Sequence, residues 1–284
     1  LTLRTAAGAM NINGTQTMGA NSLTITTDSN LALAVGANLT GTGTLTIAGQ
    51  SAATTMGLGT GQAGTLSLTD TEIGQITNGW GSLVFGLTTA TGAMNVGALT
   101  WNDALTLRTA AGAMNINGTQ TMGANNLTIS TDSNLALAVG ANLTSTGTLS
   151  IFGQTASTAI GLGTRQAGTL NLTDTELSQI TNGWANILIG STAQTGAMNV
   201  KALTWNDSLT LRTAAGALNI NGTQTMGANN LTISTDSNLA LAVGANLTGT
   251  GNLIITSTTA ATTIGIAGGA GTLNLTSTEL GQIT

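Results

Sequence analysis

The chain of 284 residues contains no cysteine and no histidine, and it also lacks proline and tyrosine. Without cysteine it can form neither a disulfide nor a thiolate metal site. Cysteine and histidine together are the usual ligands of transition metals, so a zinc or similar centre is excluded on composition. The sequence therefore predicts no metal site and no cofactor.

Charge is also scarce. Charged residues make up 5% of the chain, where about 25% is usual. The net charge is −5 and no basic cluster occurs, so nothing drives binding to nucleic acid or to an anionic membrane surface. No apolar run approaches the roughly 20 residues of a membrane-spanning helix, and we expect no membrane insertion.

Apolar residues are nonetheless plentiful, at 41% of the chain. Glycine, threonine, alanine, asparagine and leucine dominate. A chain with low charge but this much leucine, isoleucine and methionine has enough apolar surface to bury, so we expect a folded protein and not a disordered one.

One long string is repeated. The segment LTLRTAAGAMNINGTQTMGAN at Leu1 returns at Leu105 and at Leu209, with Leu218 in place of Met10 and Met114. Long tandem repeats are typical of solenoids and arrays. We expect repeats at 1–104, 105–208 and, incompletely, 209–284, forming one continuous solenoid. Because the pattern is cut at both ends, we also expect the segment to belong to a longer chain.

A shorter period lies inside each repeat. Apolar residues alternate with polar ones over short runs, as in a strand with one buried face. The first series of runs begins at Leu1, Leu23, Leu45, Leu66, Leu83 and Leu105. A second series is Met10/Ile12, Leu31/Leu33, Met56/Leu58, Ile73/Ile76 and Met94/Val96, and a weaker third contains Met18, Leu39, Trp80 and Trp101. Turn-forming residues separate the runs.

This pattern predicts an all-β fold, a parallel β-helix (β-solenoid) with about 21 residues per coil and about five coils per 104-residue repeat. Substitutions between repeats agree with it: Phe85 becomes Ile189 at a proposed inward position, while Gly61 becomes Arg165 at a turn. Ala48 becomes Phe152 although alternation points it outward, which predicts a corner or an exposed face. An antiparallel sandwich would also give short strands, but similar coils in register favour stacking.

One segment departs from strand periodicity. Thr69 is followed three residues later by Glu72, and Ile73 and Ile76 come next. This is the sequence of a helix capping box. A single helical turn and a plain loop both remain open here, and again from Thr173 and Thr276.

The carboxylates are the first candidates for chemistry. Each repeat carries Asp28, Asp70, Glu72 and Asp103 or their equivalents. A polysaccharide-cleaving β-helix needs two carboxylates that converge, whereas Asp28 and Asp70 fall two coils apart. Capping and turn formation explain these residues, and Ser277 replaces Asp70 in the third repeat. We predict no catalytic residue and no cofactor-binding residue.

Arginine, tryptophan and threonine offer binding alternatives. Arg4, Arg108 and Arg212 end strands, where a structural contact or a glycan contact is possible. Tryptophan can stack on sugars or fill a coil corner; the four are Trp80, Trp101, Trp184 and Trp205. Outward threonines such as Thr24, Thr46 and Thr128 could match an ice lattice, or simply suit a solvated strand face.

The stretches LTDTEIGQITNGWGSLVFG (residues 68–86) and LTDTELSQITNGWANILIG (residues 172–190) resemble segments of very large bacterial surface proteins. These are the filamentous-haemagglutinin-like and β-strand-repeat adhesins, and the composition and long repeats are similar as well. The resemblance implies a right-handed parallel β-helix, export to the cell surface, and a role in adhesion or an extracellular fibre. It carries over no functional residue.

Three functions are therefore weighed. The first is a non-enzymatic structural protein, the repeat stalk of a surface adhesin or a segment of an extracellular filament, with self-association along or between rods. The second is a binding module for surface glycans or ice. The third is a polysaccharide-cleaving enzyme. A long, uniform chain with little charge favours the first.

Overall fold

The computed structural model describes all 284 residues. Short parallel strands make up almost all of its regular structure, and the predicted parallel β-solenoid is confirmed. The chain divides into two compact units. Unit 1 is Leu1–Gly147 with Gln179–Thr181, and unit 2 is Thr148–Ser178 with Asn182–Thr284. This division does not follow the boundaries of the 104-residue repeats.

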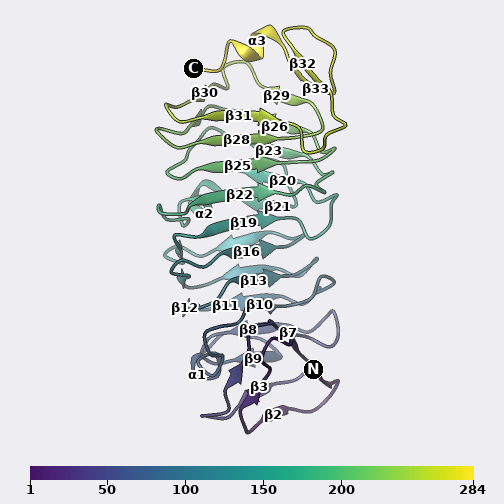
Figure 1. Ribbon diagram of the computed structural model, residues 1–284, viewed down its shortest axis with the longest axis vertical. Coiled ribbons are helices and arrows are strands. Elements are labelled where there is room, and N and C mark those ends of the chain that lie inside the picture. The colour runs from purple at the N-terminus through teal and green to yellow at the C-terminus, as the bar shows by residue number, and fades with distance from the viewer. The chain divides into compact units, whose positions relative to one another are not determined.

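Unit 1 has three faces of stacked strands (Figure 1). The first face is β1 (Thr2–Thr5), β4 (Leu23–Thr27), β7 (Thr44–Ala48), β10 (Ser82–Phe85), β13 (Leu105–Arg108) and β16 (Leu127–Ser130). On the second face, β2 (Met10–Ile12) pairs with β5 (Leu31–Leu33). A five-stranded sheet on the same face has the strand order β9 (Leu66–Leu68), β8 (Met56–Leu58), β11 (Met94–Val96), β14 (Met114–Ile116) and β17 (Leu135–Leu137). On the third face, β3 (Gln16–Thr17) pairs with β6 (Leu39–Thr40). A three-stranded sheet on this face has the strand order β12 (Leu99–Thr100), β15 (Gln120–Thr121) and β18 (Leu143–Thr144).

Unit 2 repeats the plan. Its first face is β19 (Thr148–Phe152), β22 (Asn186–Gly190), β25 (Leu209–Arg212), β28 (Leu231–Ser234) and β31 (Leu253–Thr256). Its second face contains a five-stranded sheet with the strand order β21 (Leu170–Leu172), β20 (Ile160–Leu162), β23 (Met198–Val200), β26 (Leu218–Ile220) and β29 (Leu239–Leu241). It also contains the pair β32 (Ile264–Ile266) and β33 (Leu273–Leu275). Its third is β24 (Leu203–Thr204), β27 (Gln224–Thr225) and β30 (Leu247–Thr248).

The core is a set of columns in which like residues lie one above another. Leu23 pairs with Leu45, which in turn pairs with Leu83. The side chains of Leu23, Leu45 and Leu83 are at most 3% exposed. A strand of three to five residues cannot bury its apolar face alone, so each coil depends on the coils above and below it. Each fully buried leucine or isoleucine is worth about 1.5–3 kcal/mol.

The structure differs from the prediction at the coil expected to begin at Leu66. On the first face of unit 1, the apolar runs begin at Leu1, Leu23, Leu45, Leu83 and Leu105. Measured from one start to the next, the third coil is 38 residues long and the others are 22. Strand β9 does not join the first face but pairs in parallel with β8. Each complete 104-residue repeat therefore contributes four coils to this face, one of them long.

Glycine allows this local excursion. Parallel neighbours are normally joined by a crossover of about a dozen residues or more, yet β8 and β9 are separated only by Gly59–Thr65. The returning chain crosses directly over Gly57, because a Cβ atom on Gly64 would lie 2.1 Å from the Gly57 nitrogen. Any larger residue at Gly64 would collide with backbone, which cannot move aside as a side chain can.

The helical alternative is correct for the residues after β9. Helix α1 (Asp70–Ile73) begins with the complete capping box: Glu72 N–H donates to Thr69 Oγ1, and Thr69 N–H donates to the Glu72 carboxylate. The same box begins α2 (Asp174–Leu177) and α3 (Ser277–Leu280). Ile76 then forms a parallel bridge with Leu39 on the third face, so Ile73 and Ile76 are not a second-series strand. Each of the three helices has four residues, far fewer than a membrane-spanning helix needs.

Candidate functional site

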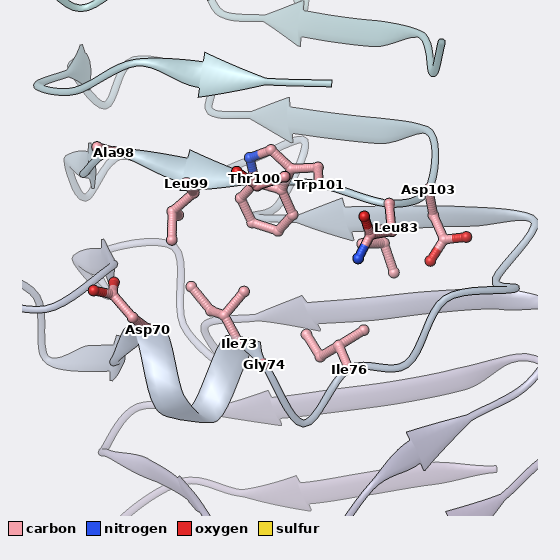
Figure 2. Close-up of a pocket in the computed structure, with 11 residues that line it drawn as sticks. Asp70, Ile73, Gly74, Ile76, Leu83, Ala98, Leu99, Thr100, Trp101 and Asp103 are labelled. Atoms are coloured by element: carbon pink, nitrogen blue, oxygen red, sulfur yellow. The ribbon is translucent and has the colours of Figure 1, made fainter. Parts of the chain in front are cut away.

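A pocket of unit 1 opens on the third face, between β12 and the segment of residues 70–76 that contains α1 (Figure 2). Its volume is about 330 Å³. Ile76 is bridged to Leu39 on one side, but it forms no ladder with β12 on the other, and the pocket occupies that gap. In Figure 2, Ile73 points from this segment toward Leu99 of β12, and Ile76 also lines the pocket.

Two carboxylates and an indole lie at the edges of this pocket, and each is already engaged. Asp70 and Asp103 lie at opposite ends. Asp70 Oδ1 accepts a hydrogen bond of 2.9 Å from Thr60 N–H, and Asp103 Oδ1 accepts one of 2.9 Å from Gly79 N–H. The Trp101 indole N–H donates to Gln120 Oε1 at 2.9 Å. The pocket therefore offers no convergent acid and base.

The remaining carboxylates of the repeat bond to a neighbouring coil. Glu72 Oε1 accepts from Leu33 N–H at 3.3 Å, in addition to its capping role. Asp28 Oδ1 accepts from Ser51 N–H at 2.7 Å and from the Thr54 hydroxyl. These side chains supply acceptors where the turns interrupt the backbone ladder. They do not converge, and no group of three or more Asp, Glu, His or Cys residues is placed to hold a metal ion.

The turn carboxylate has a shifted pKa in two of the repeats. Partial burial raises the pKa of Asp28, but the hydrogen bonds from Thr54 and Ser51 outweigh it, and the net result is a pKa below the ordinary value. Asp236 occupies the same place in the third repeat. Its pKa is likewise lowered, because bonds from Thr262, Thr259 and Thr258 exceed the effect of burial.

Two of the five basic residues, Arg108 and Lys201, have side-chain contacts within the fold. Arg108 is half-buried, its Nε donates to Gly86 O at 3.0 Å, and burial lowers its pKa. Lys201 lies 2.7 Å from Asp174, an exposed ion pair that lowers the pKa of the carboxyl. Arg165 lies at a turn with a φ of 71°, in the left-handed region where its counterpart Gly61 has a φ of 80°.

The four tryptophans are buried, with 3–6% of each side chain exposed. Trp80 donates its indole N–H to Leu39 O at 3.1 Å. The rings of Trp101 and Phe85 lie 5.4 Å apart. With so little of each indole exposed, none presents a free ring face for stacking on a sugar.

The outward threonines of the first face do not form a uniform row. Thr2, Thr24 and Thr46 are aligned in register, but Val84 is next, before Thr106 and Thr128. In unit 2 the same row is Ser150, Leu188, Thr210, Thr232 and Ile254. A regular array of hydroxyl and methyl groups is therefore broken in both units.

The exception noted at Ala48 differs in burial between the two repeats. Phe152 ends β19 and is half-buried, so this position is not a fully exposed face. Ala48 is buried at the equivalent position.

Buried polar side chains are the feature that sequence reasoning missed. Gln120 is 0% exposed. In addition to accepting from Trp101, its amide donates to Gly97 O and Gly118 O, at 2.5 and 2.7 Å. The signal that could have revealed this residue is its alignment with other coils. Gln120 pairs with Leu99 on one side and with Leu143 on the other, so it occupies a position that is apolar in both neighbouring coils. An amide in a leucine column requires a full set of partners.

Comparison with known proteins adds no identification: no family model, no curated protein and no solved structure matches the chain.

Proposed function

We propose that the protein is a non-enzymatic structural element, a repeat segment of an extracellular stalk or filament on a bacterial surface. The observation that supports this most is the repetition of one coil plan with its core columns in register. Leu105, Leu127 and their neighbours continue the columns begun by Leu23 and Leu45. A stack of interchangeable coils can be lengthened without redesign, which is what a spacer needs.

The use of the polar residues supports the same proposal. Asp28, Asp70, Glu72 and Asp103 all accept hydrogen bonds from backbone or neighbouring turns. The indoles are buried. The side chains with chemical or binding potential are thus engaged in holding coils together. Surface glycans remain possible partners of such a stalk, but no feature of the described surface favours them.

The stable coil stack that a stalk requires can be tested by limited trypsin digestion. The chain has five Lys and Arg residues. Arg108 and Arg212 lie within strands of the first face, whereas Arg165 lies in an exposed turn. The native protein should be cut first after Arg165, giving fragments 1–165 and 166–284, and then resist further cleavage, while a urea-unfolded control should be cut at every site. Rapid cleavage of the native chain at Arg108 and Arg212 would count against a stable stalk.

Location and activity need separate measurements. Antibody labelling of intact cells that carry the gene should detect the repeat at the surface. A reducing-sugar assay on candidate polysaccharides should give no activity. Polysaccharide cleavage that disappears in an Asp70→Asn or Asp103→Asn variant would overturn the non-enzymatic assignment, and thermal hysteresis or saturable glycan binding would favour a binding module.

A further inference from the structure

Three valines are the exception to the burial of large apolar side chains in the stacked coils. Val35, Val139 and Val243 are 84%, 85% and 94% exposed. Each stands at the same place in its repeat, in the turn that joins a second-face strand to a third-face strand. Between the first coil and the last, no other large hydrophobic side chain is exposed. We call these three side chains the valine knobs.

The turns that carry the knobs are well ordered. Ala37 N–H donates to Ala34 O at 2.8 Å, and Gly36 has a φ of 84°. This hydrogen bond and this glycine conformation are those of a type II turn with Val35 at its tip. Equivalent bonds hold the turn of Val139. Because the turn is already fixed, docking its tip costs little conformational entropy.

The pocket on the third face of unit 1 has a free backbone edge. Its strand β12 is the terminal strand of its sheet. Leu99 N–H and Trp101 N–H donate to Thr119 O and Thr121 O in the next coil, both at 2.9 Å. Because backbone groups alternate in direction along a strand, the N–H and C=O of Thr100 between them face the pocket that Thr100 lines.

This pocket is a product of the long third coil and lies inside the stack. On the second face that coil contributes both β8 and β9, whereas on the first face it contributes only β7, which pairs directly with β10. On the third face it contributes the segment at Ile76, which pairs with Leu39 on one side and leaves β12 unpaired on the other. The extra strand on one face is thus matched by a gap on another.

We propose that a valine knob of one chain docks into the third-face pocket of a second copy, so that two solenoids associate side by side. The pocket of about 330 Å³ leaves room for a valine side chain and the peptide units beside it. Ile73 and Leu99 supply apolar contacts there, and Thr100 offers a backbone donor and acceptor to the turn. The inference deepens the proposed structural function, because it names the contact by which solenoids associate.

The chain itself argues for a second copy as the occupant. Residues 34–38 carry no charge, so the carboxylates of Asp70 and Asp103 at the two ends of the pocket do not repel them. The exposure of Val35 and Val139 shows that neither knob is seated in its own chain. An apolar side chain that fits a pocket elsewhere on the same protein joins copies in an open-ended series.

A single knob makes a weak contact. One turn covers much less surface than the roughly 1,200 Å² of a stable interface. Knobs recur every 104 residues, however, and several contacts between the same two partners act together. We therefore expect weak, reversible association of the 284-residue chain that depends on its concentration.

Sedimentation equilibrium of the full chain, up to millimolar protein, tests the knobs. The knobless variant combines Val35→Ser, Val139→Ser and Val243→Ser. It should associate at least about tenfold more weakly, because burial of a single valine side chain is worth more than one factor of ten in affinity. The side chains are exposed, so the variant should fold, and circular dichroism checks this.

The matched control changes exposed turn residues at another corner, between the first and second faces. It combines Ala7→Ser, Ala111→Ser and Ala215→Ser. Association should equal that of the unchanged chain, since this control has the same number of serines in turns but keeps the knobs.

Cross-linking tests the pocket side of the contact. The chain has no cysteine, so a Thr121→Cys variant can carry one photoreactive benzophenone on the coil next to Thr100. In a mixture of isotopically labelled and unlabelled chains, it should cross-link to residues 34–38, 138–142 or 242–246 of the other chain. The same label at Ala111→Cys should not. The amide of Thr100 should also gain protection from hydrogen exchange as the protein concentration rises.

Three results would overturn the inference. These are a monomeric chain at millimolar concentration, a knobless variant that associates as strongly as the unchanged chain, and association that leaves the exchange of the Thr100 amide unaltered. None of them affects the trypsin experiment on the coil stack, so failure of the knob contact and failure of the stalk proposal can be told apart.

Discussion

The stacking of coils predicts how much stability is lost when one apolar side chain is shortened. The same position is covered by neighbouring strands on both sides in the first repeat and exposed in the third. Leu58 of β8 is 0% exposed, because β9 and β11 pair with β8 on its two sides. Ile266 occupies the same position in the third repeat and is 59% exposed. Replacing each by alanine removes the same number of carbon atoms from the same coil position.

The expected losses differ severalfold. Removing three carbons at about 0.8 kcal/mol each gives about 2.4 kcal/mol of transfer free energy for a fully buried side chain. The cavity left beneath β11 adds to this, so Leu58→Ala should lower the free energy of unfolding by about 3–5 kcal/mol. Only about two fifths of the Ile266 surface is buried, and with open solvent beside it no cavity forms. Ile266→Ala should therefore cost about 1 kcal/mol.

Urea denaturation measures the difference, and native-state hydrogen exchange locates it. Repeat proteins can unfold in parts, so protection should be followed separately at Met94–Val96 and at Leu273–Leu275. Leu58→Ala should reduce protection in β11 and β9. Equal losses for the two variants, or a loss below about 1 kcal/mol for Leu58→Ala, would refute the reasoning that coil-on-coil burial holds this protein together.

Three further predictions concern backbone strain, close packing and pH. Arg165→Gly should stabilise the protein by about 1 kcal/mol because it relieves a left-handed backbone, and Gly61→Arg should cost a similar amount; paired urea melts would show whether the two changes have opposite signs. Gly64→Ala should destabilise by several kcal/mol or prevent folding, since its Cβ would collide with backbone, and a variant with an unchanged melting temperature would contradict that geometry. Asp28 and Asp236 have lowered pKa values in the folded chain. Their stabilisation is present above the unfolded pKa of about 3.9 and is lost as pH falls through the folded pKa, so stability should drop below about pH 4, and less steeply in the double Asp→Asn variant.

Much of the fold was accessible from alternation alone. The runs at Leu23, Leu45, Leu83 and Leu105 form the first face as predicted, and the capping box at Thr69 gives a helical turn. The run at Leu66 shows the limit of this reasoning. Its alternation is that of a strand, and a strand forms, but periodicity cannot tell which neighbour a strand chooses.

The candidate site was accessible only in part. The sequence indicated that Asp28, Asp70 and Asp103 serve turns, and each carboxylate does accept a backbone N–H. It could not show that the bonds of Asp28 and Asp103 cross from one coil to another, because partners 23 and 24 residues away are set by the length of a coil. Asp70 bonds within its own long coil, across the loop that joins β8 to β9. Gln120 was missed for the same reason: its partners Trp101 and Gly97 belong to the coil before it.

The amino-acid sequence by itself indicated that the chain winds into coils, because a period-two pattern repeated at near-constant spacing lets short strands bury their apolar faces by stacking on similar neighbours. Only the tertiary structure decided which coil covers which. The pairing of β9 with β8 depends on Gly57 and Gly64 meeting in space, a contact between residues that local pattern treats as independent.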